Sequence, residues 1–338
     1  MSETESPKKL PFIIISAISI VTVLATALWL HFLFTPIVVN KPLVYVLKQG
    51  ISAQTLAEEL KDQTQLKYPF LFKMLIKLRQ DDPRLQAGEY KFPIGSTPSD
   101  ILNTIVKGKI FNHTFTIVDG WNYRQMMEQL NTTQGLNHTL KNKSARYVAQ
   151  AIGIKKYQSP EGLLFPNTYY FTKGQKDVDV LKRAYQAMRN YLADEWPERA
   201  DHLPYQNFYQ ALIVASMVEK EASIENERPI VAAIILKRYK TWMHLQIDST
   251  VIYGLGEQFN GKLSKEDLKL KTPYNTYLHY GLPPTPICMP GRSAIDAAFH
   301  PAKTKALYFV AKGDGSHVFS DTLEEQNKAV AKYQKPEM

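Results

Sequence analysis

A continuous apolar segment near the N-terminus constrains the fold of this 338-residue chain more than any other feature. Residues 12–34 read FIIISAISIVTVLATALWLHFLF and contain no Asp, Glu, Lys or Arg. As a helix, these residues are long enough to span the ~30 Å hydrocarbon core of a bilayer. A cleaved signal peptide is the alternative, with Ala25-Thr26-Ala27 as the cleavage site, but the apolar run continues past it to Phe34. We therefore expect an uncleaved transmembrane anchor at residues 12–34.

Charge sets the expected orientation of this anchor. Lys8 and Lys9 precede it directly, and basic flanks remain in the cytoplasm. Residues 1–11 are accordingly predicted to be a cytoplasmic tail, with the rest of the chain on the other side of the membrane. The formal net charge of +9 predicts an anionic partner. The candidates are nucleic acid, anionic lipid headgroups and a carboxylate-bearing polymer, and an exported domain argues against nucleic acid.

Cysteine and histidine usage gives no indication of a disulfide framework, a metal or a cofactor. Cys288 is the one cysteine, so an intrachain disulfide is impossible. The eight histidines form no HxxxH or HExxH pair. The hydrophobic content of 44% is ordinary for folded domains that form their own cores. We expect no metal site and no cofactor.

Two segments after the anchor share a pattern at an offset of 70 residues. Residues 44–60 (VYVLKQGISAQTLAEEL) and 114–130 (TFTIVDGWNYRQMMEQL) each read as an alternating strand, a glycine turn and an amphipathic helix. Any βα unit can show this pattern, so an internal repeat remains one of two interpretations. Residues 69–78 are helical by spacing and 85–92 read as a strand. This βααβ order resembles the LysM glycan-binding module.

The remaining segments predict an α+β fold. Thr97, Pro98 and Asp100 form a helix start signal, and residues 131–145 are polar enough to be a linker. The C-terminal part is predicted to contain helices at 180–196, 208–223, 230–242 and 322–335 and a hairpin of strands at 306–312 and 317–320. The expected domains are the anchor, a LysM-like subdomain at 43–110, a second βα unit and linker at 111–145, and a larger mixed α+β domain at 146–338.

A cluster of glutamates follows the most apolar predicted helix. Residues 211–218 are apolar on every face, which predicts a buried helix. Glu219 and Glu221 extend it and lie about 200° apart around the helix, so they cannot act together on one bond. Burial raises the pKa of a carboxyl group, as a general acid near neutral pH requires. Spacing does not choose between these two, whereas Glu225 and Glu227 are expected to be solvated.

Two further segments carry the side chains that commonly hold sugars. Residues 245–256 and 272–291 combine tyrosines with amide and carboxylate groups, followed by a proline-rich loop. A tyrosine-rich core is the alternative interpretation of the same residues. The predicted substrate-binding residues are Gln246, Asp248, Tyr253, Tyr274, Asn275 and Tyr277.

Five motifs in sequence order resemble the YceG-like family, whose bacterial members are membrane-anchored endolytic murein transglycosylases. They are EGLLFPNTYYF (161–171), VEKEAS (218–223), LQIDSTVIYGLGEQFNGKL (245–263), TPYNTYLHYGLPPTPICMPG (272–291) and AAFHPAKTKALYFVAKGDGSHVFSDT (297–322). The resemblance implies that the second glutamate of VEKEAS, Glu221, is catalytic. The family usually has Asp-Pro-Thr where this chain has Asp248-Ser249-Thr250, and Asp where this chain has Asn167.

The resemblance also implies a reaction and a location. The expected substrate is the peptidoglycan glycan strand, cut between N-acetylmuramic acid (MurNAc) and N-acetylglucosamine (GlcNAc) to leave a 1,6-anhydro end, with Glu221 as acid and then base. The expected location is the bacterial inner membrane with the catalytic domain, residues 146–338, outside the cytoplasm, near peptidoglycan synthases. The alternatives are a non-catalytic, membrane-tethered glycan-binding protein and a hydrolase that uses Glu225 or Asp248 as a second carboxylate.

Overall fold

The computed structural model describes residues 9–334. The expected cytoplasmic tail, residues 1–11, therefore lies mostly outside the described residues, as do the last four residues of the chain. The chain separates into two compact units, Met1–His113 and Thr114–Met338. Each unit has its own cluster of buried apolar side chains.

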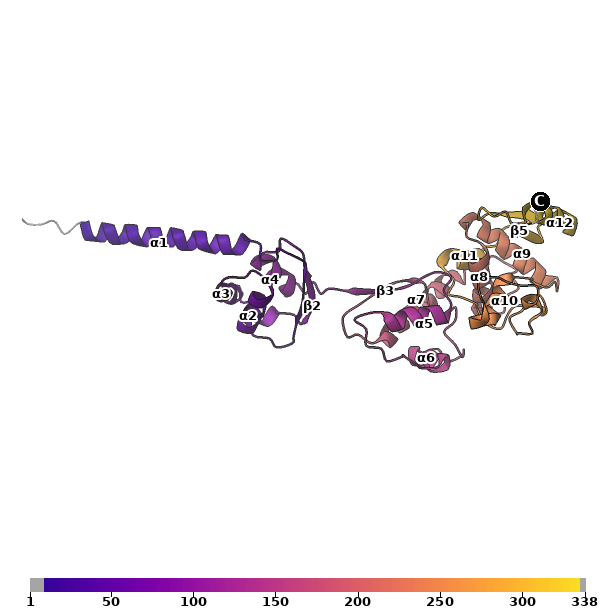
Figure 1. Cartoon of the computed structure of the whole chain (residues 1–338), viewed down its shortest axis with the longest axis horizontal. Coiled ribbons are helices and arrows are strands. Elements are labelled where there is room, and N and C mark those ends of the chain that lie inside the picture. The colour runs from indigo at the N-terminus through magenta and orange to yellow at the C-terminus, as the bar shows by residue number, and fades with distance from the viewer. Residues whose placement is uncertain (1–8, 335–338) are drawn as a thin grey trace, which may run out of the picture. The chain divides into compact units, whose positions relative to one another are not determined.

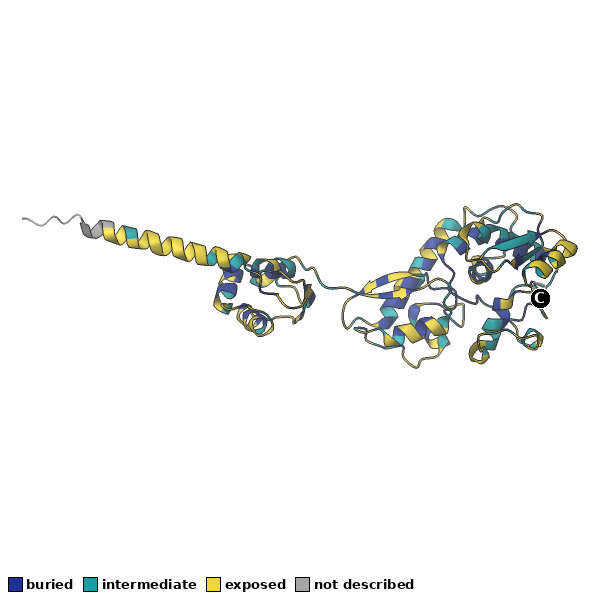
Figure 2. Cartoon of the chain, turned by 45° about the horizontal axis from the view of Figure 1, so that its top comes forward, coloured by how far each residue is buried: buried dark blue, intermediate teal, exposed yellow. Residues whose placement is uncertain are grey.

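The first element is a long apolar helix, α1 (Lys9–Phe34). Its segment Ile13–Phe34 is long and apolar enough to cross a membrane. Figure 1 shows α1 as one uninterrupted helix, and Figure 2 shows it exposed along nearly its whole length. Phe32, in its last turn, is buried in the core of the N-terminal unit. The prediction of a single apolar helix near the N-terminus is confirmed.

The rest of the N-terminal unit is a two-stranded antiparallel sheet with three helices. Leu43 pairs with Phe92 at one end of the sheet and Leu47 with Gly88 at the other. The elements after α1 are β1 (Leu43–Leu47), α2 (Ala53–Gln63), α3 (Pro69–Leu78), η1 (Asp82–Arg84), β2 (Gly88–Phe92) and α4 (Pro98–Val106).

Helix α4 begins where the residues Thr97, Pro98 and Asp100 predict a helix start. The Thr97 hydroxyl accepts a hydrogen bond from the Asp100 backbone N–H, and the Asp100 carboxylate accepts one from the Thr97 N–H. This reciprocal capping box satisfies two N–H groups that the first helical turn leaves without partners. The predicted helix start at Thr97 is confirmed.

The predicted strand–turn–helix pattern occurs twice, in the same positions relative to the offset of 70. β1 and α2 correspond to β3 (His113–Ile117) and α5 (Tyr123–Thr132). The turn glycines, Gly50 and Gly120, have φ of 76° and 77°, a left-handed conformation that glycine adopts without strain.

The second copy then continues through α6 (Ala145–Ile152) to β4 (Asn167–Phe171), which pairs with β3. The order strand–helix–helix–strand is therefore present in both places, and the expected boundary at residue 145 falls on the first residue of α6, inside the second copy.

The larger part of the C-terminal unit is mainly helical and ends in a hairpin whose strands, β5 and β6, are antiparallel. Its further elements are α7 (Asp177–Glu195), α8 (Phe208–Glu221), η2 (Glu225–Glu227), α9 (Arg228–Lys240), α10 (Asp248–Leu255), η3 (Gly256–Gln258), η4 (Asp267–Lys269), α11 (Arg292–Phe299), β5 (Tyr308–Ala311), β6 (His317–Ser320) and α12 (Leu323–Tyr333). All the helices expected after residue 146 and the hairpin are present, so the mixed α+β prediction is confirmed.

Helix α7 begins at Asp177, three residues before the predicted start. The buried Asp177 carboxylate accepts hydrogen bonds from the backbone N–H groups of Thr139, Leu140 and Val178. This carboxylate also favours the helix N-terminus electrostatically. A contact between segments about 38 residues apart in sequence thus extends the helix, and local periodicity does not reveal it.

Helix α8 is the centre of this unit. Every residue from Ala211 to Val218 is buried, as the all-apolar sequence predicts, and α9 and α11 pack against it. The buried Ser216 hydroxyl donates to the Ile213 carbonyl oxygen and accepts from the Ile287 N–H. The proline-rich loop is therefore fastened to α8, so both the helix end and the loop have fixed positions.

Candidate active site

Glu221 is the last residue of α8, and its carboxylate is in contact with the start of α10. The Ser249 hydroxyl donates a hydrogen bond of 2.7 Å to its Oε1 atom. Burial raises the pKa of Glu221 above its ordinary value. The hydroxyl and the backbone amide of Ser249 lower it, the negative charge of Asp248 raises it, and His317 lowers it. The net effect is a Glu221 pKa above its ordinary value.

The negative charge of Glu219, on the other side of the same helix, is balanced by a cation. Its carboxylate accepts hydrogen bonds from the Arg228 guanidinium at 2.9 Å and from the Gly291 N–H at 3.0 Å. Both side chains of this ion pair are largely buried. The pair joins α8 to the first residue of α9 and to the N-cap of α11. The Glu219 carboxylate is therefore occupied by structural partners.

The expectation that Glu227 is solvated was wrong. Its side chain is largely buried and accepts hydrogen bonds from the His317 ring at 2.7 Å and from the His317 backbone N–H at 3.1 Å. The partner is 90 residues away on β6, which is why local polarity misleads at this position. Glu225 is exposed, as expected.

Two of the predicted substrate-binding residues lie close to Glu221. The Tyr277 hydroxyl donates a hydrogen bond to the exposed Asp248 carboxylate. Asp248 and Tyr277 both interact electrostatically with Glu221. Gln246 is exposed, and its backbone has a left-handed φ of 54° with its N–H bonded to the Thr276 carbonyl oxygen. These residues stand at the N-terminal end of α10, next to Glu221.

A second buried carboxylate, Glu161, also contacts α10. Its side chain accepts hydrogen bonds from the Tyr253 hydroxyl at 2.9 Å and from the Tyr123 backbone N–H at 3.0 Å. Burial raises the pKa of Glu161 to about 7, although these hydrogen bonds lower it. No ion pair of Glu161 with a cation is found among the described residues.

Glu161 and Ser249 line a cavity of about 590 Å³, which we call the Glu161 pocket. The first residues of α5 form one wall and α10 forms the other. The lining residues are Gly120, Asn122, Tyr123, Arg124, Gln125, Ala145, Ser159, Glu161, Lys220, Ser249, Ile252, Tyr253, Gly256, Phe259 and Ile287. Because Ser249 lines this pocket and also donates to Glu221, the two carboxyl groups belong to one region.

Helix α10 explains this arrangement. Ser249 and Tyr253 are four residues apart, so they lie on one face of the helix, separated by about 6 Å along its axis. One contacts Glu221 and the other contacts Glu161. The Tyr253 ring packs against Tyr274 at 4.7 Å, and the hydroxyl groups of Tyr274 and Thr285 are 2.9 Å apart. Tyr274 therefore supports Tyr253 from the proline-rich loop.

The position of Glu161 depends on the glycine that follows it. Gly162 has a φ of 71°, and a Cβ atom there would lie 2.3 Å from the Pro286 Cβ. Any other residue would be strained and would collide with the proline-rich loop. This close approach holds the segment that begins at Glu161 against the loop.

Asn275 does not face a cavity. It is fully buried, and its Nδ2 donates to the carbonyl oxygens of Leu268 and Leu270 while its Oδ1 accepts from the Tyr277 N–H. Both amide hydrogens are used within the loop. Asn275 thus positions Tyr277, and its own amide is not presented to a substrate.

This arrangement suits proton transfer by a carboxyl group. A carboxylic acid with a raised pKa can donate a proton at near-neutral pH and later accept one. Among the described residues, no three His, Cys, Asp or Glu side chains gather into a group that could hold a metal ion.

Comparison with known proteins identifies the family of this chain. The sequence model of the YceG-like family matches residues 45–332. The chain belongs to the YceG-like family. The expectation drawn from the five motifs is thereby confirmed.

Two curated members of this family resemble the chain over most of its length. An endolytic murein transglycosylase from Bacillus subtilis (strain 168) is 31% identical over 302 residues, which cover 84% of this chain and 82% of the relative. An endolytic murein transglycosylase from Streptococcus pneumoniae serotype 2 is 24% identical over 320 residues, covering 84% of this chain and 57% of that protein. The chain thus spans little more than half of the streptococcal relative.

A solved structure resembles the fold. The crystal structure of a yceG-like protein from Listeria monocytogenes superimposes with a TM-score of 0.53 at 27% identity. The match covers 86% of this chain and 99% of the Listeria chain.

Two site residues were missed from the sequence. In the sequence Glu161 stands out only as part of a family motif, although an acidic residue two positions before the apolar run 163–165 is an unusual placement. Ser249 stands out only as a departure from the family's usual proline. Its hydroxyl and N–H both bond to Glu221, and proline offers neither group.

The raised pKa of Glu161 predicts how stability depends on pH. In the folded chain the group holds its proton up to about pH 7, whereas an ordinary glutamate loses it near 4.5. The stabilising contribution of the protonated form is therefore complete below pH 4.5 and is lost as the pH rises to 7. Glu161→Gln removes this dependence.

We expect the stability of Glu161→Gln relative to the wild type to increase by roughly 2–3 kcal/mol between pH 4.5 and 7. Denaturant unfolding at several pH values measures this. The exposed Glu225→Gln serves as the control and should follow the wild type. Parallel pH profiles for Glu161→Gln and wild type would contradict the assignment.

Proposed function

We propose that the chain is a membrane-anchored lytic transglycosylase that cuts peptidoglycan strands internally between MurNAc and GlcNAc. The product would carry a 1,6-anhydro-MurNAc end. The observation that carries this proposal is the pair of glutamates on α8, of which Glu219 is neutralised by Arg228 and Glu221 is not. The names of the curated relatives support the same reaction class.

In the proposed reaction Glu221 first donates a proton and then accepts another. Its protonated carboxyl donates to the glycosidic oxygen as the bond to muramyl C1 breaks, and the GlcNAc unit leaves with a free 4-hydroxyl group. Positive charge develops at C1, and the muramyl C6 hydroxyl attacks there while the Glu221 carboxylate removes its proton. The bond from O6 to C1 closes the anhydro ring, no water is consumed, and Glu221 returns to its protonated form.

We assign supporting roles to the residues around Glu221. The Asp248 carboxylate, held by Tyr277, supplies negative charge close to the centre where positive charge develops. Tyr253 and Gln246 would contact sugar hydroxyl or acetamido groups. Tyr274 and Asn275 would act indirectly, by supporting Tyr253 and Tyr277.

A hydrolase is the second candidate, and Glu161 is the observation that favours it. Retaining and inverting glycosidases need two carboxyl groups, separated by about 5–5.5 Å or 6.5–9.5 Å respectively. Glu161 and Glu221 contact α10 at points about one helical turn apart. Of the partners considered earlier, Glu225 is exposed on η2 and Asp248 is bound to Tyr277.

The proposal also covers the location of the anchor helix and the role of the N-terminal unit. We propose that α1 crosses the bacterial inner membrane, with the N-terminus in the cytoplasm and both units outside, near peptidoglycan synthases. The LysM-like segment, residues 43–110, would hold glycan. A cavity of about 200 Å³ there, lined by Gln54, Lys73 and the exposed Phe70, has the aromatic and polar groups that suit a sugar.

Product analysis tests the reaction. The purified full-length chain in detergent is incubated with peptidoglycan strands, and the fragments are analysed by mass spectrometry. Anhydro-ended fragments, lighter by one water than hydrolysed ones, are expected. Reducing ends alone would favour the two-carboxylate hydrolase, and uncut strands that remain bound would favour the non-catalytic glycan-binding alternative.

The same substitution at the two α8 glutamates is expected to have different effects, one on activity and the other on stability. Glu221→Gln should reduce cutting at least about a hundredfold, because the proton donor is lost, with little change in stability. Glu219→Gln should destabilise the fold by roughly 3 kcal/mol, because the Arg228 guanidinium loses its partner. Initial rates and denaturant unfolding of both variants measure the contrast. Near-wild-type cutting by Glu221→Gln would refute the assignment.

Ser249 predicts a change in pH dependence. Ser249→Ala removes one donor to the Glu221 carboxylate, and Ser249→Pro removes the backbone donor as well. Both substitutions favour protonated Glu221, so the alkaline limb of the pH–rate profile should move to higher pH, further for proline than for alanine. Proline is tolerated in the first turn of α10, and Ser249→Thr should retain the wild-type profile. Unshifted profiles in both variants would exclude this role.

A further inference from the structure

A further cavity in the C-terminal unit has none of the proposed catalytic carboxylates in its lining. It has a volume of about 650 Å³, and we call it the Trp242 groove. Its lining residues are Lys156, Tyr157, Pro204, Asn207, Tyr209, Gln210, Ile213, Tyr239, Lys240, Trp242, Tyr280, Gly281, Leu282, Pro283 and Pro284. Five of them, Tyr280 to Pro284, belong to the segment 272–291, and none is among the predicted substrate-binding residues.

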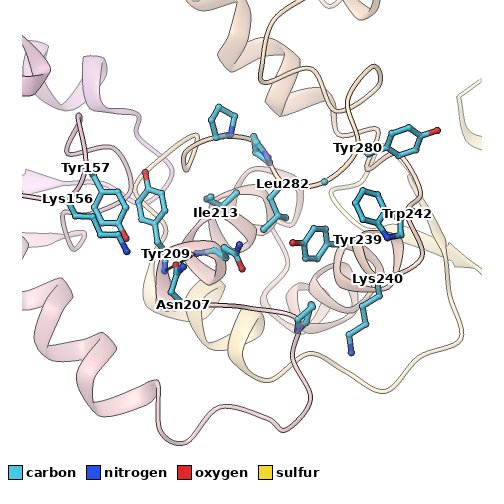
Figure 3. A pocket seen from close by; sticks show the side chains of 15 residues that line it. Lys156, Tyr157, Asn207, Tyr209, Ile213, Tyr239, Lys240, Trp242, Tyr280 and Leu282 are labelled. Atoms are coloured by element: carbon cyan, nitrogen blue, oxygen red, sulfur yellow. Dashed lines mark hydrogen bonds between the residues drawn. The ribbon is translucent and has the colours of Figure 1, made fainter.

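Aromatic rings stand at both ends of this groove. Figure 3 shows Tyr157 and Tyr209 at one end and Trp242 and Tyr280 at the other. The first two rings are stacked with centroids 3.9 Å apart. Tyr280 stacks on the His244 ring at 3.8 Å. Rings fixed by such stacking lose little freedom on binding, so they make good platforms for a flat apolar surface.

Trp242 combines two features that are energetically unfavourable for a tryptophan. Its side chain is 77% exposed, and its backbone has a left-handed φ of 53°. This position just past the C-terminus of α9 is one where glycine is usual. A bulky residue with positive φ is a rare conformation, and backbone strain of this kind is concentrated at functional sites. Neither packing nor backbone geometry explains a tryptophan here.

The charge of the groove is positive. Lys156 and Lys240 line it, and none of its lining residues, all of them in the described chain, is Asp or Glu. The Lys240 ammonium donates to the His202 carbonyl oxygen at 2.8 Å, which fixes its position, and Lys156 lies above the Tyr157 ring. A ligand that suits the groove therefore combines flat apolar faces with negative charge.

We propose that the Trp242 groove is a second binding site for the peptidoglycan strand, a proposal that rests on the proposed function. Sugar rings would stack on Trp242 and Tyr280, and carboxylates of the peptide stems would pair with Lys156 and Lys240. Peptidoglycan carries both features on one polymer.

The groove and the proposed catalytic carboxyl lie at opposite ends of α8. Tyr209 and Gln210 are in the first turn of the helix and Glu221 is its last residue, so about 18 Å of helix separates them. A single sugar cannot reach both. The site therefore favours long strands over short fragments, as internal cutting requires.

The substitution Trp242→Gly tests the proposal, because glycine adopts the observed backbone without strain. Full-length Glu221→Gln in detergent is mixed with purified peptidoglycan, and the bound fraction is measured by sedimentation with and without Trp242→Gly. We expect about tenfold weaker binding with an unchanged or higher melting temperature. In otherwise wild-type enzyme, KM should rise for long strands and not for short fragments, with kcat unchanged.

Two control variants separate the contribution of the groove's aromatic rings from that of its charge. Tyr170 is 65% exposed and lines no described cavity, so Tyr170→Ala should bind as the parent does. Lys156→Gln should weaken binding to peptidoglycan and not to glycan chains stripped of their peptide stems.

Unchanged binding and unchanged KM in Trp242→Gly would overturn the proposal. Loss of a co-purifying protein with wall binding intact would overturn it in favour of a protein-docking surface. Failure of the proposed function is a separate result, because it would appear as the absence of anhydro-ended products from the wild type.

Discussion

The cost of ending a fully buried helix in ionisable side chains shapes the whole C-terminal unit. Helix α8 is apolar on every face up to Val218 and then carries Glu219 and Glu221. A buried carboxylate must be paired, hydrogen-bonded or neutral. The fold uses the first solution for Glu219 and leaves Glu221 with hydrogen bonds from Ser249 and a raised pKa. The same helix end is therefore both a structural junction and the place of the proposed general acid.

The elements around α8 depend on this division. The Glu219–Arg228 pair connects α8 with the beginnings of α9 and α11. Ser216 fastens the proline-rich loop, which in turn supports Tyr253 through Tyr274. One face of helix α10 carries both Ser249 and Tyr253. Ser249 donates to Glu221, and Tyr253 donates to Glu161. A rigid arrangement of this kind keeps these hydrogen-bond donors in position.

Local features of the sequence predicted the elements well. The bounds of α3 and the capping box at Thr97 followed from propensity and capping chemistry, which act within a few residues. Residues that depend on distant partners were not predicted. Glu161 bonds to Tyr123 and Tyr253, 38 and 92 residues away, and Glu227 bonds to His317. The helical wheel left Glu219 and Glu221 equivalent, because Arg228 and Gly291 approach one of them only in the folded chain.

The protonation state of Glu221 is the most direct test of this account. Glutamate side chains are labelled with ¹³C at the carboxyl carbon, and the full-length chain is titrated by NMR. The resonance that disappears in Glu221→Gln identifies the residue. We predict that it titrates above the ordinary glutamate value of 4.5. A Glu221 that titrates at or below this value would be ionised at neutral pH and would contradict its role as the general acid.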